Sequence, residues 1–199
     1  MLRKLVLLAS ACLVIVLAGL AHAQEIAIAA GGSTLFSAKP TSASQAYPPP
    51  REAGGNYPGV SVEAVFKNRY GLNVESSFRY KEGLYNGFQR YRPILTDVNG
   101  VFAPRTGRRT SADIMAGFGI QNLVFYNKFS SCSVAPCPAL ISNTHFLLHA
   151  GAGVRYYFLG HVFVRPEAHY YYIVENTNQF HSGNIVRLGA SIGYSFGRK

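Results

Sequence analysis

The stretch FLLHAGAGVRYYF, residues 146–158, alternates between two kinds of side chain. Every second residue from Phe146 to Phe158 is apolar or aromatic, whereas the residues between them include His149, two glycines and Arg155. Because neighbouring side chains of a β-strand point to opposite faces, this pattern predicts a strand with one apolar and one polar face.

The same alternation recurs along the chain. It also covers, in part with more noise, residues 25–37, 55–66, 70–81, 90–103, 110–126, 161–174 and 186–196. The connections between these eight predicted strands alternate in length, and the short ones lie at residues 67–69, 104–109 and 159–160. Short periplasmic turns and longer external loops are typical of outer-membrane barrels. We therefore predict an all-β fold, an eight-stranded antiparallel up-and-down transmembrane β-barrel.

The composition agrees with a membrane barrel. Of 199 residues only 14% are charged, and 19 Lys and Arg stand against 9 Asp and Glu, whereas about a quarter of a soluble domain is charged. The 13% aromatic content argues against disorder. Three cysteines are too few for a small fold held together by disulfides.

The first residues have the pattern of an export signal. Arg3 and Lys4 precede an apolar run over 5–20, and the small residues of the AHA sequence at 21–23 suit a signal peptidase. A membrane anchor, or a lipoprotein signal ending at Cys12, is the alternative. We predict a signal peptide over residues 1–23 and a barrel over 24–199.

The apolar faces could point inward, as in a secreted barrel of the lipocalin kind, or outward into lipid. Glycines on the polar face favour a polar interior, because they leave room there for large side chains and would weaken a solvated face. Aromatic residues near the short turns favour a membrane interface: Phe66, Tyr70, Phe102, Tyr156, Phe158, Tyr194 and Phe196. We expect Tyr85, Phe88, Tyr91 and Arg92 to belong to the outer girdle, with an adhesive patch as the alternative.

The last strand carries a spaced pattern of a polar residue, a glycine, two apolar residues and a closing aromatic: Arg187, Gly189, Ile192, Tyr194 and Phe196. In this pattern, and in its strands and loops, the region 24–199 resembles the small OmpA/OmpX-like outer-membrane barrels of Gram-negative bacteria. The resemblance covers the barrel domain only. It implies that the barrel-assembly machinery reads this strand. It also implies a monomer among outer-membrane lipids, with a structural or surface-interaction role and an extracellular ligand still to be named.

A narrow eight-stranded interior is filled by side chains, so its charges must pair. The alternation points nine charged residues inward: Glu63, Glu75, Arg79, Asp97, Asp113, Arg155, Arg165, Glu167 and Arg187. We expect a buried ion-pair network that closes the barrel. A proton or ion path along the same residues is the alternative.

Two further groups of residues lie in connections. Cys132 and Cys137 fall in one long loop, and in an oxidising compartment they are most simply a disulfide. A basic rim at the short-turn end comprises Lys67, Arg69, Arg105, Arg108, Arg109, Arg198 and Lys199. We expect this rim to contact anionic phospholipid headgroups. Nucleic acid is not expected as a partner of an exported chain.

No enzyme motif fits its required context. The sequence GASIG at 189–193 matches a nucleophile elbow, but it lies inside continuous strand alternation and not at a strand-to-helix turn. His181 and Ser182 are adjacent, unlike the spaced pair of lipid A deacylase barrels. We therefore expect no enzyme, cofactor or metal. The alternatives are a lipid A-modifying barrel enzyme and, second, a small-solute pore.

Overall fold

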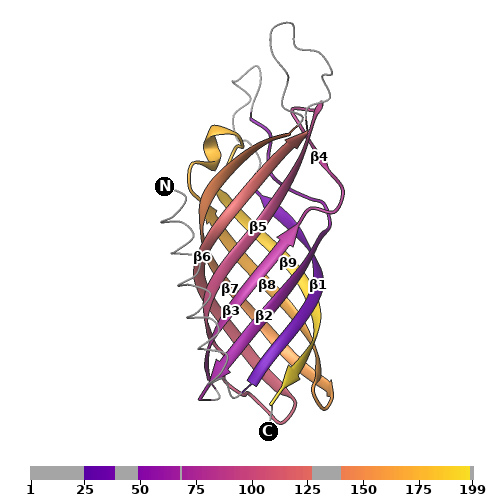
Figure 1. Ribbon diagram of the computed structural model, residues 1–199, viewed down its shortest axis with the longest axis vertical. Helices are drawn as coiled ribbons and strands as arrows, with labels where there is room; N and C mark the ends of the chain where they lie inside the picture. Colours follow the sequence, from indigo (N-terminus) through magenta and orange to yellow (C-terminus); the bar gives the residue numbers. More distant parts are fainter. Residues whose placement is uncertain (1–24, 39–48, 68, 127–139, 198–199) are drawn as a thin grey trace, which may run out of the picture.

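The computed structural model describes residues 25–38, 49–67, 69–126 and 140–197, and these fold into one sheet (Figure 1). Its elements are β1 (Glu25–Ser37), β2 (Tyr57–Phe66), β3 (Tyr70–Phe78), β4 (Gly83–Tyr85), β5 (Gln89–Phe102), β6 (Thr110–Tyr126), β7 (Leu140–Leu159), β8 (Val162–Ile173), the short 3-10 helix η1 (Asn176–Asn178) and β9 (Asn184–Phe196). The export signal predicted over 1–23 lies outside the described residues.

Antiparallel pairing closes the sheet into a barrel. Neighbours along the sheet are β3, β2, β1, β9, β8, β7, β6 and β5, and β3 also pairs with β5. The first and last strands pair from Ile26↔Phe196 to Ser37↔Ile185, and β3 meets β5 from Tyr70↔Phe102 to Phe78↔Ile94. The three-residue β4 pairs only with β5, beyond the outer end of β3. The eight long strands therefore form the predicted up-and-down barrel, and the prediction of fold class is confirmed.

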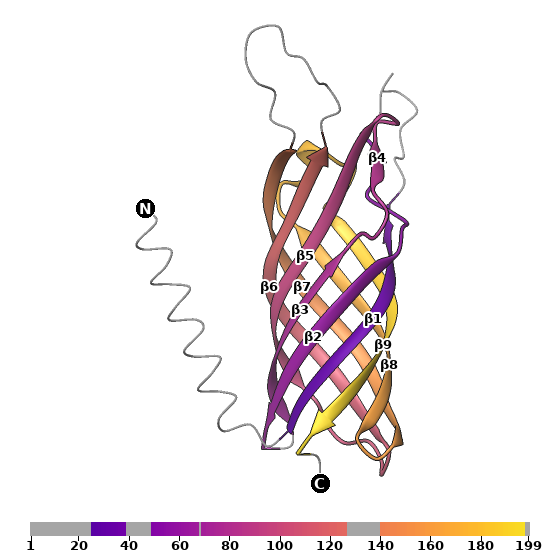
Figure 2. The same cartoon turned by 45° about the vertical axis from the view of Figure 1, so that its right-hand side comes forward.

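The two ends of the barrel differ, as the loop lengths predict. Figure 2 shows the tight turns at the lower end, together with the start of β1 and the end of β9. The turn between β7 and β8 is so short that Gly160 takes a left-handed φ of 50°, which a side chain would disfavour. The long connections lie at the opposite end, which we call the outer end.

β7 begins at Leu140, whereas the alternation indicates a start at Phe146. The strand is longer because every residue of β6 pairs with β7, up to the pair Tyr126↔Leu140. Residues 140–145 are exposed or half-buried on both faces. The period-two signal fades there because both faces of the strand meet similar surroundings.

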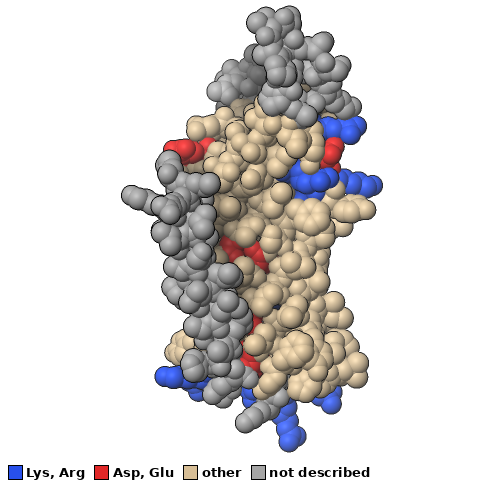
Figure 3. Space-filling model, in the orientation of Figure 1, with Lys and Arg blue, Asp and Glu red and all other residues tan. Residues whose placement is uncertain are grey.

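The outer wall of the barrel is apolar. Ile114, Phe118 and Ile192 are more than half exposed, at 56%, 58% and 55%. In Figure 3, Lys and Arg gather at the lower rim and near the upper end. Most of the wall between these two zones shows neither basic nor acidic side chains. No helix among the described residues combines the length and hydropathy needed to span a bilayer. With charges inside and apolar side chains outside, this wall suits lipid and not water.

Aromatic residues on this wall lie near the short turns, where Tyr70 is 61% and Phe196 51% exposed. The expected outer girdle is only partly present. Phe88 is exposed, but Tyr91 is buried and Tyr85 is half-buried, so the expectation for these two residues is wrong. Both rings face inward because the outer end of the barrel is closed by an aromatic cluster, described below.

Candidate functional site: the barrel interior and its outer closure

The inner half of the lumen, nearest the short turns, is crossed by two arginines. Arg155 of β7 donates from Nε to Asp113 Oδ2 at 2.6 Å and forms an ion pair with Glu63 of β2. Arg165 of β8 lies 3.7 Å from Glu63 and 3.6 Å from Asp113, measured from its Nη1. All four side chains are at most 2% exposed, so these charges are shielded from bulk solvent.

This cluster connects opposite walls. In the closed order of strands, β2 and β7 are four strands apart in either direction, so the Arg155–Glu63 pair crosses the full width of the lumen. Gly153 makes room for its neighbour: a Cβ there would lie 3.2 Å from Arg165 Cγ. Glu25, at the start of β1, accepts a hydrogen bond from the Tyr157 hydroxyl at 3.1 Å and lies 4.0 Å from Arg155.

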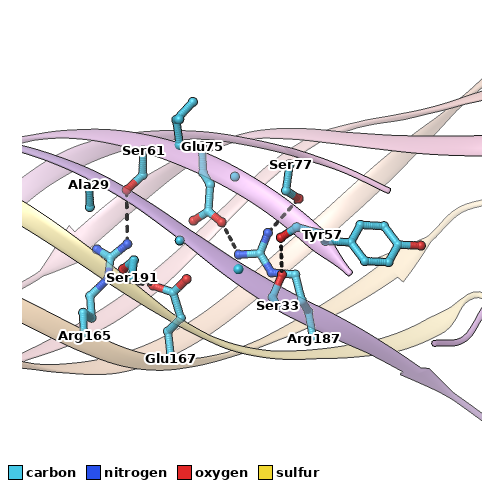
Figure 4. A pocket seen from close by; sticks show the side chains of 14 residues that line it. Ala29, Ser33, Tyr57, Ser61, Glu75, Ser77, Arg165, Glu167, Arg187 and Ser191 are labelled. Carbon is cyan, nitrogen blue, oxygen red and sulfur yellow. Dashed lines mark hydrogen bonds and ion pairs between the residues drawn. The ribbon is translucent and has the colours of Figure 1, made fainter. Parts of the chain in front are cut away.

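A second cluster lies nearer the outer end. Arg187 of β9 pairs with Glu75 of β3 and donates to Ser77 Oγ at 2.8 Å, and its guanidinium lies over the Tyr171 ring at 5.6 Å. Arg165 donates to Glu167 Oε2 at 2.7 Å. Figure 4 shows these two pairs on either side of a small polar cavity. The cavity has room for about one water molecule.

Two histidines lie beside the second cluster, where His169 Nε2 is 3.6 Å from Glu167 Oε1. His149 Nε2 and His169 Nδ1 are 2.9 Å apart, and the rings stack at 5.1 Å. His149 Nδ1 also hydrogen-bonds to Asn99 Oδ1 and lies 3.5 Å from Asp97. Gly151 supplies the space, because a Cβ there would lie 3.0 Å from a nitrogen of each ring.

The outer end of the lumen is closed by a residue that lies in no strand. Glu52, in the connection between β1 and β2, is fully buried. Its two oxygens accept from Gln121 Nε2 at 2.7 and 2.8 Å, and Asn176 donates to it at 3.4 Å. Burial raises the pKa of the Glu52 carboxyl from 4.5 to about 7, and those amides and the charge of Arg79 oppose the rise.

An aromatic cluster packs beside this closure. Phe180, which follows η1, lies 5.4 Å from the Tyr91 ring and 5.6 Å from Tyr85, and Phe125 of β6 joins them. The Tyr85 hydroxyl donates to the carbonyl of Gln179 at 2.9 Å. The connections between β1 and β2 and between β8 and β9 therefore both pack onto the outer mouth.

The structure brings together eight of the nine interior residues named from the sequence. The ninth, Arg79, lies at the outer end and donates to the Tyr91 hydroxyl at 3.1 Å. Sequence reasoning missed Glu52, because it lies in a proline-rich connection without alternation. Glu25 could have been predicted as an interior residue, since it lies two and four residues before the buried Ala27 and Ala29 and so on the same face of the strand.

The other predicted residues lie as follows. Ile192, Tyr194 and Phe196 point outward on β9, and Arg187 points inward. In the basic rim, Lys67, Arg69, Arg105, Arg108 and Arg109 are exposed. The remaining predicted residues lie outside the described part of the chain: Cys132, Cys137, Arg198 and Lys199.

No protein-family model and no curated protein sequence matches this chain. Solved structures do. The N-terminal β-barrel domain of Pseudomonas aeruginosa OprF is similar with a TM-score of 0.60 and 16% identity, over 87% of this chain and 98% of that one. This chain has the fold of a small outer-membrane barrel.

Two further structures support that fold. Neisserial surface protein A (NspA) gives a TM-score of 0.57 at 11% identity, over 85% of this chain and 95% of that one. Ail, the attachment invasion locus protein of Yersinia pestis, gives 0.55 at 14% identity, over 86% and 98%. At these identities the likeness shows the architecture and not the activity.

Proposed function

We propose that this chain is an outer-membrane barrel with a closed polar interior, whose role is structural or surface-interacting and not catalytic. In this proposal residues 1–23 direct export, and the barrel-assembly machinery recognises the final strand through Arg187, Gly189, Ile192, Tyr194 and Phe196. The folded barrel is a monomer held among outer-membrane lipids and presents its long connections to the outside.

One observation carries the closed interior. The Arg155–Glu63 pair joins opposite walls, and Asp113 and Arg165 fill the same level of the lumen. A path for solutes would have to break these buried pairs, and leaving one such charge unpaired costs about 3–5 kcal/mol. The outer closure by Glu52 is a second barrier in series.

Conductance in a planar bilayer tests this proposal. We expect the purified chain to insert without stable channel steps. A variant with Arg155, Arg165, Arg187 and Glu52 all replaced by Ala should show a leak, because it removes side chains from both ion-pair clusters and from the outer closure. Regular, long-lived openings of the unaltered protein, with heat-modifiable gel migration showing a folded barrel, would contradict a closed interior.

The surface role rests on the extension formed by β4 and the outer part of β5. Leu84 and Phe88 are 60% and 72% exposed there, and Arg90 is half exposed beside Glu82. Ail, which shares the fold, has been solved in complex with the heparin analogue sucrose octasulfate. We propose that this extension contacts a polyanionic extracellular ligand.

Retention on heparin resin tests the extension. Replacing Arg90 and Arg92 by Gln should lower the salt concentration at which the barrel elutes. The matched control replaces Lys67 and Arg69, which have the same charge but lie at the opposite end of the barrel. Equal losses in both variants would show attraction by net charge alone and would contradict a site on the extension.

A further inference from the structure

Three side chains that can bind a metal ion converge inside the barrel from opposite walls. Glu75 belongs to β3, and Glu167 and His169 belong to β8, which lies four strands from β3 in either direction. One ligand atom of each lies within 4.8 Å of the others. The three side chains are 5%, 8% and 0% exposed, in that order.

The arginines leave one side of each carboxylate free. Arg187 pairs with Glu75 Oε1, and Arg165 donates to Glu167 Oε2 at 2.7 Å. The second oxygen of Glu75 is buried without a hydrogen-bond partner, and Glu167 Oε1 lies 3.6 Å from His169 Nε2. The His169 Nε2 atom is also buried without a hydrogen-bond partner.

The neighbouring hydrogen bonds fix the tautomer of His169. The Asn99 amide nitrogen donates to Asp97 Oδ1 and to Asn73 Oδ1, so Asn99 Oδ1 is the atom that faces His149 Nδ1 and accepts from it. His149 Nε2 is then an acceptor, and the proton between the two rings is on His169 Nδ1. A neutral His169 therefore carries a lone pair on Nε2.

A lone pair and two carboxylate oxygens pointing at one buried place repel each other unless a positive charge lies between them. Either a proton on His169 Nε2 or a bound metal ion can supply this positive charge. The ring is held as metal-bound histidines usually are, because its second nitrogen donates to a fixed acceptor.

The charge of the whole lumen favours the metal ion. Glu52 is not counted, because its pKa lies at about 7. The other described residues that line the lumen include six carboxylates and four arginines, namely Glu25, Glu63, Glu75, Asp97, Asp113 and Glu167 against Arg79, Arg155, Arg165 and Arg187. A divalent ion offsets more of this excess than a single proton does.

We propose that Glu75, Glu167 and His169 form a binding site for a divalent transition-metal ion that joins the β3 and β8 walls of the barrel. Two carboxylate oxygens and one imidazole nitrogen suit Zn²⁺ and related ions of intermediate softness, which take oxygen and nitrogen ligands at about 2.0–2.2 Å. Rotation of the Glu75, Glu167 and His169 side chains toward one another brings their ligand atoms to that distance from a bound ion. This site goes beyond the proposed function, since a closed barrel does not require a metal ion.

The test uses the full chain without a histidine tag, folded in detergent with Zn²⁺ and then dialysed. Metal analysis should find one zinc per chain. His169→Gln and Glu75→Gln should lose it, and His149→Gln should bind about 10–100-fold more weakly, because His149 only orients the ligand. A control with His161→Gln and Glu82→Gln, both away from the lumen, should keep the metal.

X-ray absorption of the zinc-loaded wild-type protein makes the test independent of how the variants fold. One nitrogen and two or more oxygens around zinc are expected. Three results would overturn the proposal: folded wild-type protein without zinc, equal zinc content in His169→Gln, or a zinc environment of sulfur or several imidazoles. Nitrogen NMR that shows a protonated His169 Nε2 unchanged by Zn²⁺ would assign the site to a proton and also overturn it.

Discussion

Glu52 and Gln121 are 69 residues apart in the chain, yet the Gln121 amide donates to both oxygens of the Glu52 carboxylate, at 2.7 and 2.8 Å. This contact fastens the connection between β1 and β2 to the inside of β6. It also places an acidic group in full burial, with Arg79, Tyr57 and Tyr91 as the other charged or titratable side chains that act on it.

The outer closure should weaken as pH rises. Because the pKa of Glu52 is raised from 4.5 to about 7 in the folded protein, the folded state holds a proton that the opened state releases between these values. The free energy of opening the closure therefore falls by about 3 kcal/mol in all between pH 4.5 and pH 7. Above pH 7 it stays constant.

Hydrogen exchange of residues 49–56, corrected for its intrinsic pH dependence, measures this effect. Protection should be greater at pH 5 than at pH 8. Glu52→Gln should show the same protection at both pH values, since it has no proton to lose. A wild-type closure equally protected at both pH values would contradict the prediction.

Removing one member of the central ion pairs should destabilise the barrel. Asp113→Asn removes the carboxylate that accepts from Arg155 Nε and lies 3.6 Å from Arg165, which breaks a buried ion pair, and we expect a loss of about 3–5 kcal/mol. Urea unfolding in lipid vesicles, followed by circular dichroism, measures it. Glu82→Gln, which breaks an exposed pair with Arg90, is the control and should cost under about 1 kcal/mol.

Glycines on the inner face should be less replaceable than those on the outer face. A Cβ at Gly119 would lie 2.8 Å from Asp97 Cβ and also meet the backbone of β5, whereas at Gly100 the nearest atom is 3.8 Å away. Gly119→Ala should therefore cost about 1–3 kcal/mol through overpacking, and Gly100→Ala should leave stability nearly unchanged. Equal unfolding midpoints for the two variants would refute this difference.

The basic rim should bind anionic lipid. Native mass spectrometry of the barrel released from mixed-lipid nanodiscs should detect bound phosphatidylglycerol. Replacing Lys67, Arg69, Arg105, Arg108 and Arg109 by Gln should remove it, at about 1 kcal/mol for each contact. A variant with Arg90 and Arg92 replaced is the control, since these lie at the other end. Unchanged lipid retention in the rim variant would show a rim that is merely solvated.

We also predict that Cys132 and Cys137 form a disulfide. A thiol reagent under denaturing, non-reducing conditions should find neither residue reactive. After reduction both should react, and peptide mapping by mass spectrometry assigns the sites. Reaction of both cysteines before reduction would contradict the pairing.

Much of the interior could be predicted from the sequence because strand alternation is local. Once Arg155 shares a face with His149 and Gly151, it points the same way wherever β7 is placed. The partners of Arg155 could not be predicted in this way. Glu63 lies on the opposite wall, and its height in the lumen depends on the stagger between neighbouring strands, which no single strand encodes.

The same reasoning explains Tyr91. Tyr91 lies an even number of residues from the inward-facing Asp97 on the same strand, which places its ring inward. The aromatic enrichment near a strand end suggested a membrane girdle instead. Which of the two holds depends on whether the outer mouth is filled, and Phe180 of a distant connection fills it.

The sequence alone determined the strands, their inward and outward faces and the alternation of long and short connections, because these depend on a two-residue period and on turn length. The tertiary structure alone decided that Glu75 meets His169 across the lumen and that Glu52 closes the outer end. Both contacts join residues far apart in the chain, and they exist only because the barrel is closed and narrow enough for side chains from opposite walls to touch.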